Sequence, residues 1–124
     1  MKKIIFLFIG ILPFAVVFSC KHEPILDNVP EISFSNDILP LIQSNCQHSG
    51  CHDTTGYGPF PLIDYQTVMD NGDIEAGSPE DSKLYELITD PDPADRMPQP
   101  PYEPLSERNI KLIYFWIAQG AKNN

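Results

Sequence analysis

The chain has 124 residues, enough for one small domain. Acidic residues outnumber basic ones by 17 to 8, and the resulting net charge of −9 argues against nucleic acid as a ligand, because phosphate binding requires clustered cations. Hydrophobic residues make up 42% and charged residues 20%, which is the composition of a globular protein and not of a disordered one. The sequence also holds 13 prolines and three cysteines, an odd number.

The N-terminus has the pattern of an export signal. Two lysines precede an apolar run from Ile4 to Val17, which is shorter than the roughly 20 residues of a membrane span. The segment Val17-Phe18-Ser19-Cys20 resembles a bacterial lipobox, with an aliphatic residue at −3, a small residue at −1 and then cysteine. That resemblance implies cleavage after residues 1–19 and lipidation of Cys20; the alternative is an uncleaved N-terminal anchor. We therefore expect an exported, membrane-anchored lipoprotein that faces the periplasm or the cell exterior.

Residues 20–32 follow the signal and lack hydrophobic periodicity. They hold two prolines and are interpreted as the lipidated cysteine and a tether. The domain itself is expected over residues 33–122. Without residues 1–19 the formal net charge becomes −11, so the exported part is more acidic than the whole chain.

The first half of the domain predicts two helices. The first begins after Ser33 or Ser35 and runs to about Asn45, with Pro40 tolerable only in its first turn. The second is a short helix over Tyr65–Asn71.

The second half predicts two more. A third helix starts with Ser78 as its N-cap and Pro79 in its first position, and it stops before Pro91. The fourth is capped by Ser106 and ends at Gly120, and its apolar residues follow helical spacing. We expect an all-α fold of about four short helices with long loops. Because such a domain buries little apolar area, something else should complete its core.

The chemistry of the sequence is concentrated in Cys46-Gln47-His48-Ser49-Gly50-Cys51-His52. Two thiols followed at once by a histidine are typical of covalent c-type haem attachment, although the usual spacer is two residues and here it is four. Thiols bond to the porphyrin vinyl groups, the histidine reaches the iron, and Gly50 supplies the backbone angles of a longer loop. Two alternatives remain open: a Cys46–Cys51 disulfide, and a zinc site that also uses His48 and His52.

From about Ile32 to Ala121 the chain resembles a small monohaem cytochrome c domain of the planctomycete-type and class I-like kind. The resemblance is carried by six pieces in order: residues 34–42, the cysteine block, Pro61-Leu62 through Gly72, Gly77 through Leu84, Met97-Pro98, and the closing segment 113–121. It implies that the N- and C-terminal helices pack together over the haem.

The resemblance also implies the ligands of one covalent haem c. Cys46 and Cys51 form the thioethers, His52 is the proximal iron ligand and Met97 the distal one. Met69 is the competing methionine, but it falls in a predicted helix, where methionine more often belongs to the core. Six residues are further candidates for either the pocket or the core: Tyr57, Leu62, Tyr65, Tyr85, Ile113 and Trp116.

The resulting hypothesis is an electron carrier and not an enzyme. Its partners are expected to be redox proteins, and if the acidic stretches Asp70–Asp81 and Asp90–Asp95 form a docking face, the partner is basic. Two other classes stay open: a haem enzyme or gas sensor with an open distal site, and a haem-free interaction lipoprotein that contains a disulfide or zinc.

Overall fold

The computed structural model describes residues 26–124, so the signal peptide and Cys20 lie outside the described part. Within it every regular element is helical, which confirms the all-α prediction. The elements are η1 (Phe34–Ile38), α1 (Leu39–Asn45), α2 (Tyr65–Asn71), η2 (Pro79–Asp81), α3 (Lys83–Thr89) and α4 (Glu107–Ala118). None of these helices combines the length and the apolar character needed to cross a membrane.

The first helix accommodates Pro40 through a wide turn. Ser33 caps it, as predicted, and accepts a hydrogen bond from the Asn36 N–H at 3.2 Å. The following turn, η1, is of the π type, in which the Leu39 N–H donates to the carbonyl of Phe34. Pro40 therefore lies in the first turn of α1, but one turn after the capped start. The wide turn suits proline because its ring would clash with the carbonyl four residues earlier in a regular α-helix.

Helix α2 has the predicted bounds, and its start is a capping box. The Asp64 carboxylate accepts from the Thr67 N–H at 2.8 Å, and the Thr67 hydroxyl accepts from the Asp64 N–H at 3.1 Å. These reciprocal bonds satisfy amide groups that have no partner within the helix.

Helix α4 is capped by Ser106, as predicted, and closes at Gly120. Gly120 has a φ of +98°, and the N–H groups of Gly120 and Ala121 donate to Ile117 and Trp116, both at 2.9 Å. This is the Schellman arrangement, in which a glycine in the left-handed region ends the helix.

The predicted third helix is divided into η2 and α3. The side chain of Ser78 makes no capping bond, and α3 starts after Ser82. Ser82 is buried; its hydroxyl donates to the Ser78 carbonyl at 2.9 Å and accepts from the Glu75 N–H at 3.0 Å. These bonds hold Ser82 in an extended conformation that interrupts the helix.

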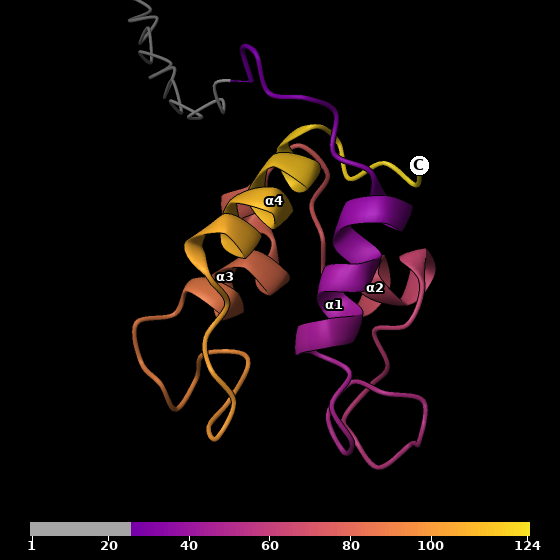
Figure 1. The fold of residues 1–124 in the computed structure, drawn as a ribbon, viewed down its shortest axis with the longest axis vertical. Helices are drawn as coiled ribbons and strands as arrows, with labels where there is room; N and C mark the ends of the chain where they lie inside the picture. The colour runs from indigo at the N-terminus through magenta and orange to yellow at the C-terminus, as the bar shows by residue number, and fades with distance from the viewer. Residues whose placement is uncertain (1–25) are drawn as a thin grey trace, which may run out of the picture.

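The core joins the first and last helices. Trp116 is fully buried, and its ring centroid lies 5.5 Å from that of Phe34, which also meets Tyr65 edge-on at 5.2 Å. The expected packing of the N- and C-terminal helices is thus confirmed. Two long loops lie at the end of the molecule opposite its C-terminus (Figure 1): the cysteine loop, residues 46–64, and the methionine loop, residues 90–106.

Candidate functional site

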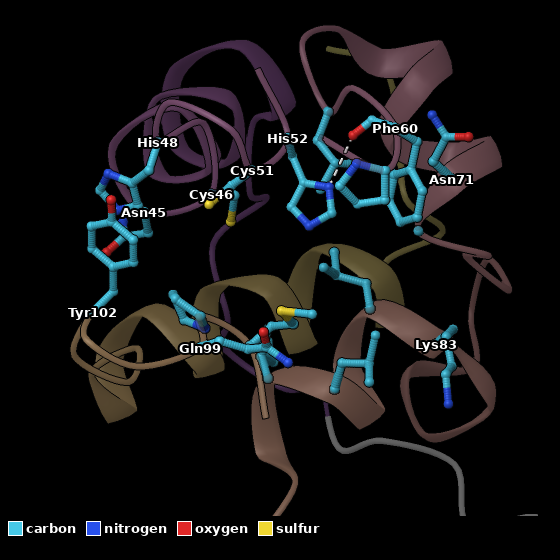
Figure 2. A pocket seen from close by; sticks show the side chains of 18 of the residues that line it. Asn45, Cys46, His48, Cys51, His52, Phe60, Asn71, Lys83, Gln99 and Tyr102 are labelled. Atoms are coloured by element: carbon cyan, nitrogen blue, oxygen red, sulfur yellow. Dashed lines mark hydrogen bonds between the residues drawn. The ribbon is translucent and has the colours of Figure 1, made fainter. Parts of the chain in front are cut away.

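A cavity of about 270 Å³ lies between the two long loops. This volume is near the lower end of small-molecule sites, which begin at roughly 300 Å³. Helix α3 supplies one wall through Leu84, Leu87 and Ile88, and most of the lining is apolar. The four residues proposed as haem ligands from the sequence also line it: Cys46, Cys51, His52 and Met97. Figure 2 shows the first three of them at the cavity.

The four-residue spacer between the cysteines is folded into a turn. The Cys51 N–H donates to the His48 carbonyl at 2.8 Å, and Gly50, the third residue of this turn, has a φ of +80°. A positive φ at that position is the mark of a type II turn and explains the glycine. The His52 N–H then donates to the Cys46 carbonyl at 3.1 Å. The turn therefore takes up the extra residues and returns His52 to the first cysteine.

Both cysteines are free thiols in this structure and not a disulfide. Figure 2 shows the two sulfur atoms side by side at the edge of the cavity. Burial, together with the nearby Cys51, raises the pKa of the Cys46 thiol to about 11. At neutral pH Cys46 is therefore an uncharged thiol, which suits an apolar cavity.

His52 is held with one ring nitrogen fixed and the other free. Its Nδ1 lies 2.9 Å from the backbone carbonyl oxygen of Phe60, and since a carbonyl only accepts, Nδ1 is the donor. The Phe60 ring also packs on the imidazole, at 4.7 Å between centroids. The imidazole points into the cavity (Figure 2), so Nε2 offers its lone pair there. A histidine ligand whose Nδ1–H is bound by a backbone carbonyl is a common arrangement at metal centres.

His48 points away from the thiols. Its ring stacks on Tyr102 of the methionine loop, with centroids 3.8 Å apart and planes inclined by 2°. Among residues 26–124 no group of three or more His, Cys, Asp or Glu side chains is placed to hold a metal ion. The zinc site considered from the sequence, which needed His48 beside both cysteines, is therefore not supported.

The cysteine loop folds closely on itself behind His52. The Leu62 N–H donates to the His52 carbonyl at 3.0 Å, and the Gln47 side chain donates to the Leu62 carbonyl at 2.7 Å. Gly58 lies so near Cys51 that a Cβ on it would overlap the Cys51 carbonyl oxygen. The sequence Gly58-Pro59-Phe60 thus requires glycine for close approach, and that approach positions the Phe60 carbonyl.

Met97 enters the cavity from the methionine loop. Its N–H donates to the carbonyl of Leu87 on α3 at 2.9 Å, which fixes the loop to the wall of the cavity. Met69 is half-buried against the hydrophobic core and does not line the cavity. The structure therefore places Met97, and not Met69, in the same cavity as His52.

Five of the other six candidates separate into pocket and core. Leu62 lines the cavity, Ile113 and Trp116 belong to the hydrophobic core, and Tyr65 and Tyr85 pack against that core. Both alternatives are wrong for Tyr57, which is 88% exposed and belongs neither to the cavity lining nor to the core. Sequence reasoning missed Phe60, since nothing in its spacing marks a residue whose backbone carbonyl binds His52. The wall formed by Leu84, Leu87 and Ile88 was detectable as the apolar face of one helix.

No protein-family model, curated protein or solved structure matches this chain. The function of the chain is therefore inferred from the residues of the cavity and their geometry.

Proposed function

We propose that this chain is an electron-transfer protein, a membrane-tethered monohaem cytochrome c with histidine and methionine as axial ligands. One observation carries the proposal. The Nε2 face of His52 points into the same apolar cavity that is lined by two thiols and a thioether. This set of donors fits a covalently attached haem better than it fits a bare metal ion, since the donors surround an apolar space.

Each residue at the cavity has a distinct part in holding the haem. Cys46 and Cys51 would form the two thioether bonds, His52 would bind the iron through Nε2, and Met97 would bind it through sulfur. The haem would supply an iron that takes up and releases one electron.

The protein controls the environment of that iron. The Phe60 carbonyl holds the imidazole in one tautomer and orientation, as the bond at 2.9 Å requires. Leu62, Leu84 and Ile88 are buried and keep water away from the cavity. A neutral thioether ligand in a water-poor site raises the reduction potential of haem iron. These features favour electron transfer.

Methionine at the distal position distinguishes this proposal from a haem enzyme or gas sensor. Such a protein needs an open coordination position for its substrate or gas. Met97 lines the cavity and is fixed to α3 through its backbone, which favours a filled position. An electron carrier needs no substrate site, so we propose no enzymatic activity.

The partner and location follow from charge and from the N-terminal pattern. The exported part carries a formal net charge of −11, so a redox partner with a basic face would associate faster at low salt than at high salt. Lipid on Cys20 would keep the protein at a membrane surface on the periplasmic or exterior side.

Expression together with a c-type maturation system tests the proposal. Denaturing gels stained for haem should show a stained band, and the intact mass should include one haem and one lipid modification. Cys46→Ala/Cys51→Ala should lose the stain. Cys20→Ala is the matched control, since it should keep the stain and lose the lipid mass. A wild-type band without stain would refute the cytochrome proposal, and a stain that survives the double substitution would refute attachment at these two cysteines.

A further inference from the structure

The cysteine and methionine loops face each other across the cavity, yet they meet through few specific contacts. Within residues 26–124 no hydrogen bond joins the two loops. The aromatic contact between them is the stack of His48 on Tyr102. Figure 2 shows these two rings face to face at one side of the cavity. Among the hydrogen bonds and aromatic contacts of the described residues, this stack is therefore the one that joins the two loops.

Each ring of the stack is rigidly connected to a residue of the site. His48 opens the turn that ends at Cys51, through the bond of 2.8 Å between their backbones. Tyr102 closes another turn, in which its N–H donates to the Gln99 carbonyl at 3.1 Å, two residues after Met97. The Gln99 side chain in turn bonds to the Ala94 carbonyl at 3.1 Å. A displacement of Tyr102 therefore carries the methionine loop with it.

We propose that His48 and Tyr102 form a clasp that holds the methionine loop closed over the cavity. Both are positioning residues, because they act on Met97 through the backbone of their loops. His48 lies within the four-residue spacer, so the longer spacer provides one half of this clasp. The clasp itself is independent of haem, whereas its effect on iron ligation rests on the proposed function.

The size of the effect follows from the energy of an aromatic pair. Such a pair stabilises its contact enough to change the ratio of closed to open loop by about 2- to 10-fold. Arg96 precedes Met97 and is half-buried, with a buried Nε that has no hydrogen-bond partner among the described residues. We therefore expect trypsin to cleave after Arg96 faster when the loop is open than when it is closed. When opening and closing are fast, the cleavage rate follows the open population.

Tryptic cleavage after Arg96, followed by mass spectrometry on the mature protein, tests the clasp without any haem signal. His48→Ala and Tyr102→Ala should each speed this cleavage by about 2- to 10-fold, and the double variant should be no faster than the faster single variant. Tyr102→Phe keeps the ring and should cleave like wild type. Tyr57→Ala is the matched control, because Tyr57 is an exposed aromatic residue of the cysteine loop without an aromatic partner among the described residues.

A second measurement tests the effect on Met97 as a ligand. Added imidazole must displace the methionine from ferric iron, so its apparent affinity should rise in both alanine variants by the same factor as the cleavage rate. Unchanged cleavage in both alanine variants would overturn the clasp. Faster cleavage with unchanged imidazole affinity would overturn its action on Met97. A wild-type protein without haem would refute the proposed function, and the cleavage assay would still decide the clasp.

Discussion

The Nδ1 atom of His52 lies 2.9 Å from the backbone carbonyl oxygen of Phe60, and this bond decides what the histidine can do. It places the proton on Nδ1 and leaves Nε2 as a base that faces the cavity. Because the partner is a backbone atom, its position depends on the fold of the cysteine loop and not on a side chain. His52 and His48 are four residues apart in the sequence, but of the two only His52 has a ring nitrogen that is hydrogen-bonded within the described residues.

Substitution of the two histidines should therefore have opposite results. His52→Ala removes the free Nε2, so any attached haem should lose its low-spin visible spectrum. His48→Ala should keep that spectrum, because His48 packs on Tyr102 and not at the thiols. Spectra of the reduced and oxidised proteins provide the measurement. A low-spin spectrum in His52→Ala would exclude His52 as the proximal ligand.

Substitution of each of the two methionines in the described part should also have a different effect. Met97→Ala should abolish the weak charge-transfer absorption of methionine bound to ferric iron. Met69→Ala should keep that absorption and lower the free energy of unfolding by about 1–2 kcal/mol, less than the 2–5 kcal/mol of a fully buried methionine, because Met69 is half-buried against the core. The charge-transfer band and thermal unfolding report the two effects separately. If the band persisted in Met97→Ala, the distal assignment would be wrong.

Even a single methyl group added at Gly58 should disturb the cysteine loop. In Gly58→Ala the new Cβ meets the Cys51 carbonyl oxygen, so the backbone beside the second thiol must shift, at a cost of about 1–3 kcal/mol. We expect lower haem incorporation as well as a lower melting temperature. Gly77→Ala is a suitable control: its φ of +88° makes alanine unfavourable by about 1–2 kcal/mol, but its Cβ would lie in open space outside the cavity lining. Gly77→Ala should thus lose stability without losing haem. Equal haem content in both variants would contradict the role of Gly58.

The capping box of α2 predicts a loss of stability in acid. Hydrogen bonds from the Thr67 amide and hydroxyl lower the pKa of the Asp64 carboxyl below its ordinary value of 3.8. The folded state therefore binds this proton less readily than the unfolded state. The stabilisation from Asp64 is present above the unfolded pKa and is lost as the pH falls through the folded pKa.

Asp64→Asn isolates this titration, because asparagine also caps helices well. The variant should melt near the wild-type temperature at pH 7 and should lose less stability than wild type when the pH is lowered to about 3. Glu103→Gln provides a control, since Glu103 is exposed and makes no hydrogen bond among the described residues. An identical acid profile for Asp64→Asn and wild type would show that this carboxyl does not contribute.

Local signals in the sequence determined most helix boundaries. Ser33, Asp64 and Ser106 begin helices, and Gly120 ends one, because a cap depends on residues three or four positions away. Where a boundary depends on more than apolar spacing and a cap residue, the sequence was less informative. The wide turn before Pro40 comes from the backbone bond between Leu39 and Phe34, and the break at buried Ser82 comes from hydrogen bonds of its side-chain hydroxyl.

The candidate site, too, was predicted in part from the sequence and decided in part by the tertiary structure. The spacing of Cys46, Cys51 and His52, together with the family resemblance that added Met97, selected four residues from the order of the chain. Only the tertiary structure placed them in one apolar cavity with a wall from α3. It also decided the partners of the two histidines: Phe60 is eight residues from His52, and Tyr102 belongs to a different loop from His48. Which histidine binds the Phe60 carbonyl and which one stacks on Tyr102 depends on how the loops fold, and residue type alone does not determine that.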